Sequence, residues 1–233
     1  MYQSWKSRFP LKFRLAAAAA VLVLSCGPLA ALDKRQNEPG QFDYYVLSLS
    51  WSPSFCEAAT ERSPDRQPPQ QQCGERPFHF VVHGLWPQYE RGFPEYCQRE
   101  APRLDRNIVS SMLDLMPSPR LIFNQWQKHG TCAGTTPRAY FDTVRRARAA
   151  VKIPEPYLDV KSYLMVSPAE VEEAFVKANP GMSNAAVAVR CDSKRLQEVR
   201  ICLSKDLKFR DCPEVDRRAC RREQLSMPPV RGG

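Results

Sequence analysis

Histidine is scarce in this sequence, and several common patterns are absent. The 233 residues include only three histidines, so the position of each one is informative. No Cys-x-x-Cys pair occurs, which disfavours a structural zinc site, although a zinc ion held by Cys132 and the nearby His129 stays open as an alternative. After residue 31 there is no apolar run of the roughly 20 residues that a membrane-spanning helix needs. Internal repeats and a clear domain boundary are also absent, which predicts one folded domain with no stable membrane span.

The first 31 residues are typical of a signal peptide and do not belong to the folded domain. A basic region precedes residues 15–24, an apolar run that is too short to cross a membrane. Small residues follow, and cleavage is expected near Ala30 or Ala31. The alternative is a lipid anchor, because residues 24–26 (LSC) loosely resemble a lipoprotein cleavage site with Cys26 as the acceptor. Both interpretations predict an exported protein, periplasmic or secreted, with residues 32–41 as a flexible lead-in.

Cysteine number and net charge limit what the exported part can be. Export places the chain in an oxidising compartment. Leaving out Cys26, an even number of cysteines remains, which predicts four disulfides: Cys56, Cys73, Cys97, Cys132, Cys191, Cys202, Cys212 and Cys220. The formal net charge is +9, and the first 31 residues hold four basic and no acidic side chains, so the remainder carries 9 − 4 = +5. A basic surface favours an anionic partner such as nucleic acid, but it is equally typical of an ordinary basic exported protein.

The apolar patterns predict separate groups of strands and helices. Residues 43–51 alternate between apolar and polar side chains, as a half-buried strand does, and residues 78–82 are nearly all apolar, as in a fully buried strand. Between them, residues 57–77 are rich in Arg, Gln and Pro and predict a surface loop. Further patterns predict helices at 104–115, 119–129, 137–151 and 167–178, strands at 186–191, 198–203 and 207–210, and a disordered tail at 221–233. Because helices and strands are segregated, we expect one α+β domain over residues 42–220.

The first of two chemically rich motifs is residues 80–87 (FVVHGLWP). We expect His83 to stand at the end of the apolar strand, where a strand can present a side chain to a cleft. His79 lies inside the apolar run and is expected to be a core or supporting residue. Trp86, and Trp126 in the second motif, each suit either core packing or contact with a ligand.

The second motif is residues 123–132 (FNQWQKHGTC), in a helix that a Ser-Pro pair can begin and Gly130 can end. In such a helix Gln125, Lys128 and His129 are three and four positions apart and share one face. The motif therefore predicts a cluster of an amide, an ammonium and an imidazole.

Two histidines and a lysine suit the cleavage of RNA without a metal. The 2′-hydroxyl of RNA attacks the neighbouring phosphate, which requires one group to take its proton and another to protonate the leaving 5′-oxygen. Imidazole can do either because its pKa lies near neutrality, and Lys128 can stabilise the extra negative charge at phosphorus. The product would be a 2′,3′-cyclic phosphate, and DNA would not be cut because it lacks the 2′-hydroxyl. Trp86, Tyr89 and Trp126 are expected to offer stacking surfaces for bases.

The two motifs resemble the active-site segments of the ribonuclease T2 family, and residues 51–56 (WSPSFC) resemble the start of its domain. The resemblance covers residues 43–220. It implies a disulfide-stapled α+β fold with an antiparallel sheet packed with helices, of the exported bacterial type. It also implies an endoribonuclease that cuts single-stranded RNA with low base specificity, through the cyclic phosphate to 3′-phosphate ends. By the same resemblance His129 would be the general base, His83 the general acid and Lys128 the phosphate stabiliser.

The sequence departs from the family pattern at three positions. Gln125 stands where the family usually has a glutamate, and Asn124 where it often has a histidine, which bears on the rate of cleavage. Gln88 stands where many members have an aspartate or asparagine that helps to read a base. We expect Gln125 in the catalytic group, and Trp86, Gln88 and Trp126 at the substrate.

The resemblance also implies how the cysteines pair and what the enzyme requires. The implied disulfides are Cys56–Cys73, Cys97–Cys132, Cys191–Cys220 and Cys202–Cys212. The enzyme is expected to work as a monomer, with no metal ion and no other cofactor. Two alternatives remain: a catalytically weakened relative that binds RNA or another partner, and an exported binding module in which the motif residues only form core. Cleavage of RNA in EDTA separates the first from an active enzyme, and the placement of the two motif histidines separates the second.

Overall fold

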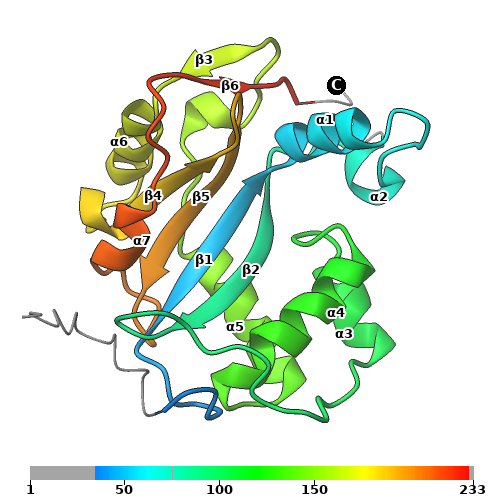
Figure 1. Ribbon diagram of the computed structural model, residues 1–233, viewed down its shortest axis with the longest axis vertical. Coiled ribbons are helices and arrows are strands. Elements are labelled where there is room, and N and C mark those ends of the chain that lie inside the picture. The colour runs from blue at the N-terminus through cyan, green and yellow to red at the C-terminus, as the bar shows by residue number, and fades with distance from the viewer. Residues whose placement is uncertain (1–34, 75, 231–233) are drawn as a thin grey trace, which may run out of the picture. The chain divides into compact units, whose positions relative to one another are not determined.

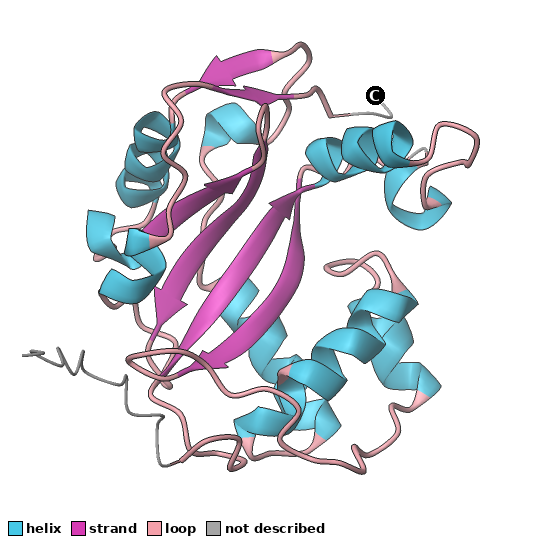
Figure 2. Cartoon of the chain, in the orientation of Figure 1, coloured by secondary structure: helices cyan, strands magenta, loops and turns pink. Residues whose placement is uncertain are grey.

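An antiparallel sheet with the strand order β2-β1-β5-β4 forms the centre of the chain (Figure 1). The computed structural model describes residues 35–74 and 76–230, all of which fall in one unit. A second, two-stranded sheet pairs β3 with β6 (Figure 2). The strands and helices are β1 (Tyr44–Trp51), α1 (Ser52–Arg62), α2 (Gln70–Cys73), β2 (Phe80–Gln88), α3 (Arg106–Met112), α4 (Pro119–Lys128), α5 (Pro137–Ala149), β3 (Leu164–Val166), α6 (Pro168–Ala178), β4 (Val187–Cys191), β5 (Leu196–Leu203), α7 (Pro213–Arg217) and β6 (Leu225–Met227). These elements confirm the predicted α+β class.

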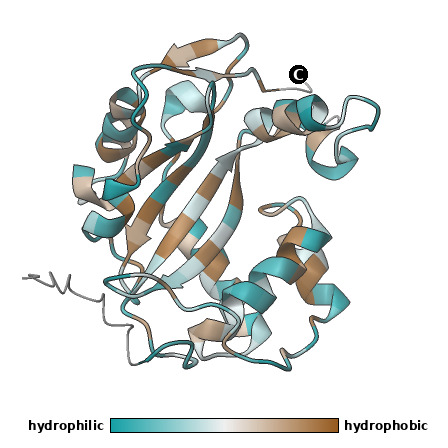
Figure 3. Cartoon of the chain, in the orientation of Figure 1, coloured by the Kyte–Doolittle hydropathy of each residue, from teal (hydrophilic) through white to brown (hydrophobic). Residues whose placement is uncertain are grey.

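One face of the central sheet forms the core. The register pairs Leu47 of β1 with Leu85 of β2 on one side and with Ile201 of β5 on the other, and all three side chains are fully buried. Because side chains alternate between the two faces of a strand, the apolar residues at every second position meet on this face. Figure 3 shows brown and pale segments alternating along β1. Helices α4 and α5 contact β2, and α6 contacts β4.

The opposite face of the sheet is divided between an apolar end and a polar part. Strands β1, β4 and β5 meet α7 in a small apolar cluster, which consists of Tyr44, Val46, Ala188, Cys202, Cys212 and Val215. Beyond this cluster the same face carries Ser48 and Ser50 of β1 next to Glu198 and Arg200 of β5. The polar part is where the candidate site lies.

The predicted helix starts are confirmed by their caps. Ser118 precedes α4, and its hydroxyl accepts a hydrogen bond from the backbone N–H of Leu121 at 3.2 Å. Ser167 and Glu170 form a capping box at the start of α6, where the sequence predicts the helix at 167–178. These local contacts satisfy backbone donors that no helical partner can reach, so the local sequence determines where α4 and α6 begin.

Four disulfides connect the described segments as the resemblance implied. They are Cys56–Cys73, Cys97–Cys132, Cys191–Cys220 and Cys202–Cys212. Because Cys132 is bonded to Cys97, it is not a zinc ligand, and the zinc alternative at this position is wrong.

The surface loop predicted for residues 57–77 is wrong in part. Helix α1 extends to Arg62, and α2 adds a further helical turn over Gln70–Cys73. The apolar pattern did not reveal α1 because its buried positions are Ser52, Pro53, Ser54 and Cys56, which lack helical spacing of large apolar residues. The strand predicted at 207–210 is reduced to a single bridge between Leu203 and Phe209.

Both predicted flexible ends are more ordered than expected. In place of a disordered tail from residue 221, β6 pairs with β3, and Leu225 and Met227 are fully buried. In the lead-in, the Asn37 N–H donates to the Tyr89 hydroxyl at 3.0 Å, and the Gly40 N–H donates to the Cys132 carbonyl at 2.9 Å. Long-range partners, which no local pattern reveals, therefore fix both segments.

The predictions for residues 1–31, the signal peptide and the Cys26 lipid anchor, lie outside the described residues. Within the described ranges, none of the helices has the length and apolar character needed to cross a membrane.

Candidate functional site

A bulge in β2 brings the first motif histidine onto the polar face of the sheet. Ser48 of β1 pairs with Gly84, whereas the next residue, Leu49, pairs with Val82, so His83 is an extra residue in β2. A bulge of this kind changes which face the following side chains occupy. His83 is thus in the middle of β2 and not at a strand end, which corrects the sequence prediction, and its ring faces the pocket that Trp86 also lines.

The C-terminal end of α4 supplies the second group of side chains. Gln125, Lys128 and His129 all line the same pocket, as their shared helix face predicts. Gln125 and His129 are each only 6% exposed. The pocket has a volume of about 300 Å³. Six of the seven predicted catalytic and substrate residues line it: His83, Trp86, Gln88, Gln125, Lys128 and His129.

The seventh predicted residue, Trp126, belongs to the core. Its side chain is 1% exposed, its indole N–H donates to the Pro102 carbonyl at 2.8 Å, and its ring packs against Tyr140. Trp126 follows Gln125 directly, and one step along a helix turns the side chain by about 100°. The prediction that Trp126 binds substrate is therefore wrong. Tyr89 is also buried, with its hydroxyl bonded to the Arg35 carbonyl.

A carboxylate from β5 holds His83. The Nδ1 of His83 lies 2.5 Å from Glu198 Oε1. The other carboxylate oxygen, Glu198 Oε2, accepts hydrogen bonds from Arg200 Nε at 3.0 Å and Nη2 at 2.8 Å. Burial raises the pKa of Glu198, but the hydrogen bond and charge of His83, together with Arg200, outweigh it and lower the pKa to about 2. Glu198 is then ionised at neutral pH and can only accept. His83 Nδ1 must therefore carry a proton, which leaves Nε2 as the ring atom that can exchange a proton with a ligand.

Trp86 connects the two motifs. Its indole N–H donates to Gln125 Oε1 at 2.7 Å, and its ring centroid lies 5.3 Å from the ring centroid of His83 and 5.3 Å from that of His129. The guanidinium of Arg200 lies over the indole, 4.9 Å from its centroid. Two imidazoles and a guanidinium therefore surround the indole, which leaves less of its surface open for stacking.

Gly84 makes the contact between Trp86 and Gln125 possible. A Cβ atom at residue 84 would lie 2.0 Å from Gln125 Oε1 and 2.5 Å from Trp86 Nε1. Real side chains do not approach so closely, so a residue larger than glycine would displace the Gln125 amide from the Trp86 indole.

His129 is a neutral imidazole at physiological pH. Burial, followed by the positive charge of Lys128 and by His83, lowers its pKa to about 3. In the described part of the chain, its buried Nδ1 has no hydrogen-bond partner. A neutral imidazole next to a lysine has the protonation state that a general base requires.

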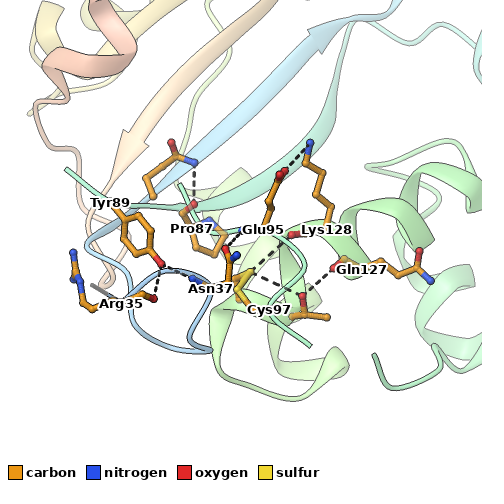
Figure 4. The surroundings of a disulfide bond; sticks show 11 residues. Arg35, Asn37, Pro87, Tyr89, Glu95, Cys97, Gln127 and Lys128 are labelled. Atoms are coloured by element: carbon orange, nitrogen blue, oxygen red, sulfur yellow. Dashed lines mark hydrogen bonds and ion pairs between the residues drawn. A yellow bond between two sulfur atoms is a disulfide. The ribbon is translucent and has the colours of Figure 1, made fainter. Parts of the chain in front are cut away.

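The loop between the motifs closes the site from the other side. The Cys97–Cys132 disulfide ties this loop to the end of the second motif, and the Tyr96 N–H donates to the Lys128 carbonyl at 2.9 Å. Glu95 Oε2 lies 3.2 Å from Lys128 Nζ (Figure 4). Both side chains of this pair are well exposed, so an incoming phosphate can replace the carboxylate at small cost.

Several pocket residues were missed by the sequence analysis. Phe93 is 41% exposed and lines the pocket, with its ring centroid 6.5 Å from that of His129. Arg200 of β5 and Arg218, which directly follows α7, add positive charge. One signal was available: Glu198 and Arg200 are two positions apart in a predicted strand and must share a face. The local sequence does not show that this face of β5 lies next to His83 and Trp86.

Comparison with known proteins identifies the family. A model of the Ribonuclease T2 family matches residues 42–212, and we conclude that the chain belongs to the ribonuclease T2 family. Ribonuclease I of Escherichia coli is 26% identical over 233 residues, covering 83% of this chain and 87% of that protein. A probable ribonuclease of Haemophilus influenzae is 33% identical over 155 residues, which cover 62% of this chain and 57% of that protein. A ribonuclease of Aeromonas hydrophila is 46% identical over 99 residues, 42% of this chain and 41% of that protein.

Solved structures share the fold. RNase NT, crystallised with 5′-AMP, has 26% sequence identity and a TM-score of 0.60, covering 81% of this chain and 98% of the other. An RNase-related protein from Calystegia sepium has 22% identity and a TM-score of 0.62 over 81% of this chain and 98% of the other.

Proposed function

We propose that this protein is an exported endoribonuclease that cleaves single-stranded RNA by transphosphorylation, with low base specificity. The observation that carries the proposal is that the two motif histidines and Lys128 line one pocket. The rings of His83 and His129 lie against the same indole, that of Trp86. An acid and a base must both reach one phosphate group in this reaction, so their convergence supports it.

In the first step His129, neutral because burial and Lys128 lower its pKa to about 3, takes the proton of the 2′-hydroxyl. The oxygen attacks phosphorus, and the ammonium of Lys128 stabilises the extra negative charge. His83 then gives a proton from Nε2 to the leaving 5′-oxygen, so one P–O bond forms as another breaks. The 2′,3′-cyclic phosphate is opened by water to a 3′-phosphate, with the two histidines exchanging roles.

Base binding is assigned to the aromatic and amide groups of the pocket. Phe93, exposed on the loop, offers a stacking surface. Gln88 is 9% exposed and its Nε2 donates to the Pro87 carbonyl at 2.9 Å, so its Oε1 is the amide atom left to accept a hydrogen bond from a base. Neither makes a donor-acceptor pattern unique to one base, which supports low base specificity.

The compartment and assembly are proposed on similar grounds. Four disulfides suit an oxidising compartment, periplasmic or extracellular. One chain supplies every group that the proposed reaction uses, so we propose that the monomer is active without a metal ion or other cofactor.

The test is cleavage of homopolymer RNA by the oxidised protein in EDTA. His83→Ala and His129→Ala should each abolish nearly all cleavage, and the double variant should be no worse, because the acid and base act as a unit. His79→Ala is the matched control, since His79 lies outside the pocket, and it should retain activity. A 2′-deoxy substrate should not be cut. Binding of RNA without cleavage would identify a weakened relative instead, and loss of activity in EDTA restored by zinc would contradict the metal-free reaction.

A further inference from the structure

Glu198 is held in a fixed position by two partners. Its side chain is 13% exposed, and its two oxygens contact His83 Nδ1 and the guanidinium of Arg200. It lies on β5, whereas His83 lies on β2, and the two residues are 115 positions apart in the sequence. Neither sequence motif predicts this contact.

The strand between them explains how the two side chains meet. Strand β1 separates β5 from β2, and Ser50 of β1 pairs with Glu198 on one side and with Val81 on the other. Ser48, two residues earlier on the same face of β1, pairs with Arg200 and Gly84. Serines are small enough to leave room above β1, and the bulge brings His83 to the same face. A large side chain at either serine would separate the pair.

We propose that Glu198 is a positioning residue for His83, acting through the imidazole and not on the substrate. This inference rests on the proposed function. The carboxylate fixes the ring so that Nδ1 is occupied and Nε2 carries out proton transfer, and it offsets the positive charge of the imidazolium in the step before the leaving oxygen is protonated. Arg200 fixes Glu198 in turn and lies over Trp86, which links the carboxylate to the wall of the pocket.

The charge distribution around the pocket makes such a carboxylate important. Gln125 contributes no charge, and its Oε1 is already used by Trp86. The titratable and charged groups that contact His83 or line the pocket with it come from β5, from the end of α4, and from α7 and the residue after it: Glu198, Arg200, Lys128, His129, Glu214 and Arg218. Positive groups outnumber negative ones in this set, and Glu198 is the carboxylate bonded to the ring. Removing its charge should therefore disfavour the protonated imidazole.

The experiment compares Glu198→Gln, which keeps the shape and an acceptor for Nδ1, with Glu198→Ala, which removes both. Glu172→Gln is the matched control, because Glu172 is a half-buried carboxylate that accepts from the Val189 N–H, away from the pocket. We expect Glu198→Gln to lower kcat about 10- to 100-fold with little change in KM, and to move the alkaline limb of the pH–rate profile to lower pH. Glu198→Ala should lower kcat further.

A spectroscopic measurement tests the contact without reference to activity. In ¹⁵N-labelled protein the ring nitrogens of His83 should report the Nδ1-protonated tautomer when the ring is neutral, and Glu198→Ala should remove this preference. If the wild-type protein cuts RNA and folded Glu198→Gln keeps its kcat and pH profile, the positioning role is wrong. If the wild-type protein does not cut RNA, the proposed function fails, and the tautomer measurement still decides whether Glu198 orients His83.

Discussion

Replacing Gln125 by glutamate is the most informative change to the second motif. Gln125 is 6% exposed, and its Oε1 accepts a hydrogen bond from the Trp86 indole at 2.7 Å. A glutamate carboxylate has the same shape and can accept the same bond, so Gln125→Glu adds a negative charge without adding volume. The added charge enters a pocket in which burial, followed by the positive charge of Lys128 and by His83, lowers the pKa of His129 to about 3.

The size of the effect follows from that environment. A neighbouring opposite charge moves a pKa by roughly one to three units, so the pKa of His129 should rise from about 3 while the ring remains mostly neutral at pH 7. His129 becomes a stronger base, and turnover should rise about ten- to a hundredfold, equivalent to roughly 1–3 kcal/mol. The acid limb of the pH–rate profile should move to higher pH. Because a buried carboxylate loses hydration, the variant should also be less stable, by about 1–3 kcal/mol.

The assay is turnover on homopolymer RNA across the pH range, with Gln127→Glu as the control. Gln127 lies two positions further along α4 and is exposed, so its variant adds the same charge to the same helix outside the pocket. It should change turnover less than about twofold, since an exposed charge is screened by solvent. Unchanged or lower turnover in folded Gln125→Glu would refute the reasoning, because the site would then be built around the amide.

Three further predictions concern stability and packing. Gly84→Ala places a methyl group 2.0 Å from Gln125 Oε1, so it should cost about 1–3 kcal/mol and most of the activity, measured by urea unfolding and RNA cleavage. Replacing Cys97 and Cys132 by serine should lower the unfolding free energy by about 2–4 kcal/mol, and an unchanged thermal transition would contradict this. The pKa of His129 is about 3 in the folded protein and about 6.5 in the unfolded chain. The neutral ring therefore contributes fully to the free energy of unfolding above pH 6.5. This contribution, roughly 5 kcal/mol in all, is lost as the pH falls toward 3. Urea unfolding between these pH values measures that loss, which should be absent from His129→Asn.

Local signals account for the parts of the site that the sequence predicted. The Ser118 cap fixes where α4 begins, and the helical period then places Gln125, Lys128 and His129 on one face. The same period would have placed Trp126 correctly, since it is four positions after Ile122, which is fully buried. The residue type alone leaves Trp126 open between core packing and substrate contact, whereas its helix face places it in the core.

Contacts between distant segments account for what the sequence did not predict. Leu225 and Met227 alternate as in a strand, but a run of three residues gives no signal without its partner β3. The His83 bulge is defined only by the register of β2 against β1. Glu198 reaches His83 across a third strand, so its role depends on strand order, which no local pattern determines.

The carboxylate introduced by Gln125→Glu and the native carboxylate of Glu198 should each act on a different histidine, and a double-mutant cycle can measure whether they do. A glutamate at 125 would act mainly on His129, the proposed base, whereas Glu198 is bonded to His83, the proposed acid. If each carboxylate serves its own histidine, combining Gln125→Glu with Glu198→Gln should give the product of the two single effects on kcat, and the acid and alkaline limbs should move independently. If one carboxylate can replace the other, the double variant should recover the activity that Glu198→Gln loses, and the coupling energy in the double-mutant cycle should exceed about 1 kcal/mol. We expect near-additivity. The side chain at 125 is held by the Trp86 indole, and the side chain at 198 occupies His83 Nδ1, so neither can take the place of the other.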